Sequence, residues 1–309
     1  MEKLVHVAAV IAPIFATVYC GMLARKKALI MPEGVQGLQQ FVLNIALPCL
    51  IFNSVLTAKV GAESLAIMAL QLPFVLGITV WAFKIGRKKY PYKNLPMMFG
   101  AQESGMLGIP LFLILFGSVN VYHMVILDLT QAIVGHPTIA ILTCETGDSP
   151  KPGEVLKKVF TSPLVIACLL ALGLNLSGAG AVLLESGVGQ VITEATTFLG
   201  QPVSTLMIFS VGYNLSLSTE NRGEILKLCT VRLLTFVVIC GAVQLLLFLI
   251  PNITALTRWA VLLYWLLPAS YIAPSLGKTE KEQTVASGVS SLLTVVTLAV
   301  FCAMAALIA

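Results

Sequence analysis

Apolar stretches follow one another along almost the whole chain, and short polar segments separate them. Each stretch is long enough to cross a bilayer as a helix, which takes about 20 residues. The pattern predicts ten transmembrane spans, numbered in chain order: 4–24, 35–57, 64–83, 94–116, 119–143, 159–176, 190–217, 225–250, 256–276 and 284–308. Because these spans fill nearly the whole sequence, we expect no separate soluble domain.

Composition supports an all-α membrane protein. Hydrophobic residues make up 58% of the chain, charged residues only 11%, and the mean hydropathy is +0.94. A soluble domain carries about 25% charged residues. The net charge of +5 is too small to indicate a nucleic-acid partner, so the expected partners are membrane lipid and a small-molecule solute.

The basic residues predict which way the spans face, because Lys and Arg near span ends stay on the cytoplasmic side. Arg232 lies two turns inside the eighth span, and we expect it to snorkel to the basic side. Three basic residues fall in connections on the other side: Lys3, Lys59 and Arg258. The basic side collects all the rest: Arg25, Lys26, Lys27, Lys84, Arg87, Lys88, Lys89, Lys93, Lys151, Lys157, Lys158, Arg222, Lys227, Lys278 and Lys281. Both termini are therefore expected outside an inner-type cell membrane.

Cysteine positions indicate neither disulfides nor a metal site. The seven cysteines are scattered, with no CxxC pair and no metal-ligand spacing. We interpret them as small apolar packing residues. No cofactor is expected, apart from Na⁺ or H⁺ as a coupling ion.

Prolines suggest an internal repeat, because a proline inside a span usually marks a designed break. Three pairs fall in corresponding spans, with offsets near half of the 309-residue length: Pro13 with Pro163, Pro48 with Pro202, and Pro110 with Pro268. An odd number of spans per unit makes the second unit enter the membrane from the opposite side. The prediction is two inverted five-helix repeats, an architecture typical of secondary transporters. Chance pairing among fifteen prolines is the alternative.

The fourth and ninth spans have too many Gly, Pro and polar residues for lipid-facing helices. We expect the fourth to open between Gln102 and Pro110, and the ninth around Pro268 and Pro274. An opened helix presents bare N–H groups that attract anions, and carbonyls that can hold Na⁺. The predicted solute-binding residues are Asn44, Gln102, Glu103, Ser104, Gly105, Pro110, Pro268, Ser270, Tyr271 and Pro274.

Two carboxyl groups lie within the spans and are candidate functional groups, because placing a charge at the bilayer centre costs free energy. Glu103 lies in the expected break, and Asp128 lies mid-span with Gln131 beside it. We predict that these three residues couple transport to H⁺ or Na⁺. The alternative is an interhelical hydrogen bond made by a protonated acid. His136 could line the cavity or relay protons, but a hydrogen-bonded packing role is the preferred interpretation.

Four segments together resemble the auxin efflux carrier family, which includes bacterial malate and malonate permeases. They are Gly21–Arg25, Phe41–Phe52, Gly105–Leu111, and Leu267–Ala269 followed by the serine-rich Ser287–Ser291.

The resemblance implies a scaffold domain, residues 1–58 and 159–218, and a mobile transport domain, residues 59–158 and 219–309. It also implies crossed fourth and ninth spans, an elevator-type motion, and a homodimer joined through the scaffold. One departure matters, because Glu103 stands where the family usually has Asn. An ionised Glu103 would repel a carboxylate, so it must be protonated or paired with Na⁺, or else the solute is not an anion.

The preferred hypothesis is a secondary transporter that moves a mono- or dicarboxylate by alternating access, with uniport and either direction left open. The alternative within transport is a Na⁺ symporter or a cation/proton antiporter on a related scaffold. An intramembrane enzyme is disfavoured, because the sequence has no HExxH motif, paired aspartates or Ser–His arrangement.

Overall fold

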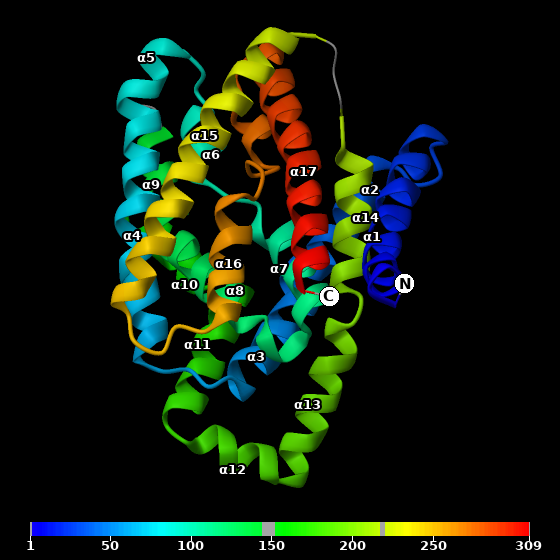
Figure 1. Cartoon of the computed structure of the whole chain (residues 1–309), viewed down its shortest axis with the longest axis vertical. Coiled ribbons are helices and arrows are strands. Elements are labelled where there is room, and N and C mark those ends of the chain that lie inside the picture. The colour runs from blue at the N-terminus through cyan, green and yellow to red at the C-terminus, as the bar shows by residue number, and fades with distance from the viewer. Residues whose placement is uncertain (1, 144–151, 217–219, 309) are drawn as a thin grey trace.

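The computed structural model describes residues 2–143, 152–216 and 220–308, and the regular elements in these ranges are helices (Figure 1). Within these ranges, six helices are long and apolar enough to cross a membrane, or seven if the bent pair α11–α12 counts as one span. The prediction of an all-α membrane protein is confirmed. The count of ten spans and the inverted repeat stay predictions.

The described part of the first half of the chain contains four long helical runs, the first of them α1, and one interrupted helix. Its elements are α1 (Glu2–Lys26), α2 (Pro32–Phe41), η1 (Val42–Ala46), α3 (Leu47–Thr57), α4 (Ala62–Trp81), η2 (Ala82–Gly86), α5 (Arg87–Lys89), α6 (Leu95–Gly100), η3 (Ser104–Gly108), α7 (Ile109–Phe116), η4 (Ser118–Asn120), α8 (Tyr122–Thr130), η5 (Gln131–Gly135) and α9 (His136–Thr143). Continuous runs Pro32–Thr57, Ala62–Lys89 and Ser118–Thr143 cover three of the predicted spans.

The second half combines several short helices with two long ones, α15 and α17. Its elements are α10 (Pro152–Phe160), α11 (Pro163–Leu176), α12 (Ala179–Glu185), α13 (Gly187–Gly200), α14 (Val203–Asn214), α15 (Arg222–Leu246), η6 (Leu247–Leu249), α16 (Ala255–Trp265), η7 (Ala273–Leu276) and α17 (Glu280–Ile308). Helices α11 and α12 meet at 93°. The α5 helix and the beginnings of α15 and α17 lie at one end of the molecule, and α12 lies at the opposite end (Figure 1).

Several prolines widen a helix instead of breaking it. Pro48, Pro110 and Pro137 each follow a five-residue π-helical turn, namely η1, η3 and η5. Proline lacks an N–H and its ring crowds the carbonyl four residues earlier, and a wider turn relieves that clash. The expectation that these prolines mark breaks is therefore wrong for Pro48.

The other prolines of the expected pairs differ from one another in local geometry. Pro13 lies inside the continuous helix α1, whereas Pro163 begins α11, where a missing N–H costs nothing. Pro202 caps α14 just after α13 ends, and Pro268 lies in an extended segment. Only the last two lie between helices.

Helix packing falls into two groups. In the first, α1 packs on α14, and α3 packs on α11 and α13. In the second, α8 packs on α4 and α16, while α15 packs on α16 and α17. Helices α1 and α14 approach each other closely, because a Cβ on Gly21 or Gly212 would collide with the backbone of the other helix. Small residues at such a contact allow membrane helices to pack backbone against backbone.

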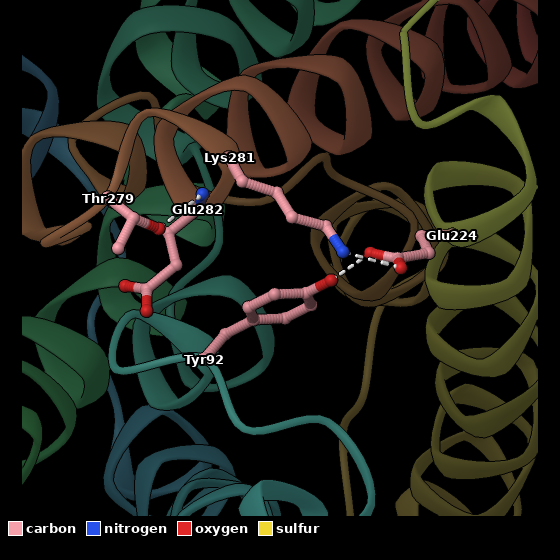
Figure 2. Close-up of polar contacts among 5 residues, drawn as sticks. All are labelled: Tyr92, Glu224, Thr279, Lys281 and Glu282. Atoms are coloured by element: carbon pink, nitrogen blue, oxygen red, sulfur yellow. Dashed lines mark hydrogen bonds and ion pairs between the residues drawn. The ribbon is translucent and has the colours of Figure 1, made fainter.

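A polar cluster ties three segments together at the end that carries α5. Figure 2 shows the Tyr92 hydroxyl donating to the Glu224 carboxylate, which also pairs with Lys281 Nζ at 2.8 Å. These residues come from the link before α6 and from the beginnings of α15 and α17. Burial, together with the neighbouring Glu224 carboxylate, raises the pKa of Tyr92 above its ordinary value. The phenol therefore stays protonated and donates.

Cysteine packing follows the prediction in part. Cys168, Cys229 and Cys240 are buried, and Cys49 and Cys302 are half-buried, but Cys20 is exposed on α1. Cys144 and Lys151 lie outside the described residues.

Candidate solute-binding site at the crossing of two broken helices

The fourth and ninth predicted spans are interrupted, and the two interruptions lie against each other. Residues 101–103 separate α6 from η3, and residues 266–272 separate α16 from η7. Gln102 and Ala269 form an antiparallel bridge, in which Glu103 N donates to Pro268 O (3.1 Å) and Ser270 N donates to Ala101 O (3.2 Å). The prediction that both spans are broken is confirmed.

A glutamine side chain completes this short stretch of strand on its other edge. Gln102 N donates to Gln131 Oε1 (3.2 Å), and Gln131 Nε2 donates to Gln102 O (3.2 Å). Tyr264 Oη donates to the same Gln131 Oε1 at 2.6 Å. Because buried backbone groups must find partners, Gln131 supplies what a third strand would supply, and we assign it this structural role.

The opening in the fourth span is narrower than the sequence predicts. Extended backbone ends at Glu103 (φ −86°, ψ 67°), and the helix resumes at Ser104 instead of continuing open to Pro110. Gly105 and Gly108 are therefore helical. At Gly108 a Cβ would lie 2.7 Å from Leu267 Cδ1, so this glycine permits close approach to the ninth span.

The two carboxyl groups of the prediction lie at the start of the resumed helix, and both are buried. Glu103 Oε2 accepts a hydrogen bond from Tyr271 N at 2.6 Å, which fastens it to the opposite break. Asp128, from α8, accepts from the Ser104 hydroxyl. The N-terminal end of the half-helix η3–α7 therefore already faces two of the protein's own acids.

A cavity of about 570 Å³ lies at this crossing. Eight of the predicted site residues line it: Gln102, Glu103, Ser104, Gly105, Asp128, Ser270, Tyr271 and Pro274. No Lys or Arg is among its lining residues, all of which belong to the described part of the chain. The cavity therefore offers hydroxyl, amide and carboxyl groups, without a fixed positive side chain.

A comparison with protein-family models gives one match for this chain. Residues 6–152 match the model of a family described as membrane transport protein. The match covers just under half of the chain, which is therefore similar to this family of membrane transport proteins. The match confirms the resemblance to the auxin efflux carrier family, whereas a bacterial malate or malonate permease stays a prediction. No match was found among curated proteins.

Four predicted site residues of this transporter do not line the cavity. Asn44 is exposed, and its Nδ2 donates to Gln40 O at 2.8 Å within its own helix. Pro110 lies deeper in α7, and the Pro268 carbonyl accepts from Glu103 N. Gln131 lies behind Gln102. These positions support the cavity wall or lie away from it.

Sequence reasoning missed a set of polar residues that line the cavity from helix ends. Gln36 and Gln39 share one face of α2, and Ser287, Ser290 and Ser291 share one face of α17. Their spacings of three and four residues would place them on one helical face, and that signal could have found them. The lining also includes Ser162, His136 and Asn214.

The eighth-span arginine contradicts its prediction. Arg232 does not snorkel, because it is 1% exposed and its guanidinium points into the crossing. It donates to the carbonyls of Met98 and Leu267, the latter at 3.3 Å. The two carbonyls lie at or next to the ends of interrupted helices, and the guanidinium makes hydrogen bonds that these interruptions leave unmade.

Proposed function

We propose that this transporter moves a small organic carboxylate together with protons, and that Glu103 and Asp128 carry those protons. The observation that carries the proposal is that both acids line the cavity at which the two broken helices meet. Gln102, whose buried Nε2 has no hydrogen-bond partner in the protein, lines the same cavity. An unpartnered donor there favours a solute that accepts hydrogen bonds.

Charge explains why protons and a carboxylate should travel together. With both acids ionised, the cavity repels an anion, and no lining Lys or Arg offsets that repulsion. Protonation removes the repulsion and leaves the N–H end of η3–α7 available to the solute. Since only differential affinity for two states can drive a carrier, coupling requires that the protonated form favour one of them.

Alternating access by an elevator-type motion is proposed from the helix packing. The scaffold domain would be residues 1–58 and 159–218, and the transport domain residues 59–158 and 219–309. The cavity lies between these parts, because α2, the start of α11 and the end of α14 line it from one side, and both helix breaks line it from the other. A sliding transport domain would carry the site past the scaffold residues.

The described state is proposed to be open to the cytoplasm. The lining residues Gln36, Ser162, Asn214 and Ser287 each lie within a few residues of a helix end next to a predicted basic loop. By the positive-inside rule these loops are cytoplasmic, which puts both termini outside the cell membrane.

The ten-span inverted repeat is proposed because the broken spans occupy corresponding fourth and ninth positions.

Homodimerisation through the scaffold is also proposed. Large apolar side chains of α13 are exposed: Val188 and Val191 are each 67% exposed, and Phe198 is 72% exposed. A second scaffold would cover this face in the membrane.

A second candidate is a cation as solute, either in symport with Na⁺ or in exchange for protons. It is favoured by the same absence of Lys and Arg among the lining residues, since two ionised carboxyl groups attract cations. The two candidates predict opposite charge preferences.

The test is ligand-induced stabilisation of the purified protein, because ligand binding to the folded state raises its unfolding midpoint. Mono- and dicarboxylates and organic amines are screened at pH 5.5 and 8, with NaCl or KCl. The proposal expects stabilisation by carboxylates that is stronger at the lower pH. Stabilisation by amines that is stronger at the higher pH would replace it with the second candidate.

A further inference from the structure

Arg232 sits at a place where membrane transporters with broken helices can hold a metal cation. The interruptions leave the C-terminal ends of α6 and α16 inside the protein, and helix C-termini carry partial negative charge. The guanidinium contacts both ends, since it donates to Met98 O, near the end of α6, and to Leu267 O, which follows α16. Exposed carbonyls of this kind coordinate Na⁺ in other transporters.

The environment of Arg232 provides no carboxylate to balance its charge. Among the described residues no acid forms an ion pair with this guanidinium. Its other neighbours are the Phe236 ring, whose centroid lies 4.0 Å from Cζ, and the Cys229 and Tyr264 side chains. The balancing negative charge therefore comes from the helix ends and the aromatic face.

Three other carbonyls of the crossing accept hydrogen bonds from protein donors. Leu266 O accepts from Thr297 Oγ1 at 2.6 Å, Ala101 O accepts from Ser270 N, and Gln102 O accepts from Gln131 Nε2. A metal ion bound to Met98 O and Leu267 O would therefore have to displace the guanidinium and none of these other donors.

We propose that Arg232 is a resident cation at the crossing, and that it fills with a side chain the carbonyl site that would otherwise bind Na⁺. The helix ends are then held by a permanent charge, and Na⁺ has no role at this site. This inference concerns the backbone carbonyls at the helix ends and is independent of the proposal that Glu103 and Asp128 carry protons. Its test therefore measures protein stability and not transport.

The first experiment is chemical rescue of Arg232→Ala. Removing the side chain leaves a cavity lined by carbonyls, and the unfolding midpoint of the detergent-solubilised protein should fall by roughly 10 °C. Low-millimolar guanidinium should restore a large part of this loss in a saturable way, and Na⁺ should stabilise the variant more than K⁺ does. The wild type should respond to neither ion.

Arg258→Ala is the matched control. Arg258 also donates to a backbone carbonyl, that of Gln244 at 3.2 Å, and also covers an aromatic ring, that of Phe248 at 4.1 Å, but it is half-buried and away from the crossing. Guanidinium and Na⁺ should leave the midpoint of this variant unchanged. Equal responses of the two alanine variants, or no response of either, would overturn the proposal.

A second pair of variants covers the case in which Arg232→Ala does not fold. Arg232→Lys keeps a cation and Arg232→Met keeps apolar bulk without charge. If Arg232 acts as a resident cation, the lysine variant should fold, and its unfolding midpoint should be higher than that of the methionine variant. A methionine variant as stable as the lysine variant, or failure of both to fold, would contradict it, because the charge would then not be what the site needs.

Discussion

The side-chain amide of Gln131 hydrogen-bonds both the N–H and the carbonyl of Gln102, the residue at the centre of the break between α6 and η3. With the main-chain bonds to Pro268 and Ser270 on the other edge, no peptide group of this extended segment depends on water. Non-helical backbone inside a membrane is tolerated only where its polar groups are hydrogen-bonded. This pairing meets that condition at the break.

Replacing Gln131 should therefore destabilise the fold. Gln131→Leu leaves two buried backbone groups unpaired, and each costs about 1–3 kcal/mol. The unfolding midpoint in detergent should fall by several degrees. Ser54→Ala is the control, because Ser54 is buried and its side-chain hydroxyl has no hydrogen-bond partner in the protein. That variant should be neutral or more stable. Equal effects of the two substitutions would contradict the role given to Gln131.

The glycine contact between α1 and α14 predicts a second stability effect. Gly212→Leu forces a side chain against the Val18 backbone, and overpacking of this kind costs about 1–3 kcal/mol or more. Gly241→Leu serves as the control, because a Cβ at Gly241 meets open space. Thermal unfolding should separate the two variants, and a stable Gly212→Leu protein would show that these helices pack differently.

The cluster at the α5 end should contribute little at neutral pH and lose strength in alkali. The Lys281–Glu224 pair is about half exposed, so Lys281→Met should cost under about 1 kcal/mol. Tyr92 has a raised pKa in the folded state, so its contribution is complete below its ordinary pKa of 10.0 and is lost as the pH rises through the folded-state value. The wild-type midpoint should fall more steeply above pH 10 than that of Tyr92→Phe, and parallel curves would contradict this linkage.

Orientation in the membrane can be tested by thiol labelling in a cysteine-free background. Lys88→Cys, at the basic end, should resist an impermeant reagent added to intact cells, whereas Glu185→Cys, at the α12 end, should react. Permeabilised cells should label both positions. Labelling of Lys88→Cys alone in intact cells would invert the proposed topology.

Much of the crossing could be predicted from the sequence because its causes are local. Gly, Pro and polar residues at 100–110 and 268–275 cannot form lipid-facing helices, so the breaks follow from composition. The acids Glu103 and Asp128 stood out for the same reason, since charge within an apolar span is rare.

The sequence does not show which residues far apart in the chain form hydrogen bonds with each other. Gln131 looked like an ion-coupling residue until its pairing with Gln102 was seen, and Arg232 looked like a snorkelling side chain until the carbonyls of Met98 and Leu267 were found beside it. Pro48 was expected to break a helix, yet a preceding π turn absorbs it. Each case depends on a neighbour or a turn geometry that span-by-span hydropathy does not encode.

Solute-driven proton movement across proteoliposomes tests the central claim most directly. Vesicles loaded with a pH-sensitive dye are given an inward gradient of a carboxylate that stabilises the protein. The account predicts acidification of the lumen by the wild type, and loss of that signal in Glu103→Gln and Asp128→Asn proteins that still bind the carboxylate. Proton movement that is unchanged in both variants, or carboxylate uptake by the wild type without any proton movement, would contradict it.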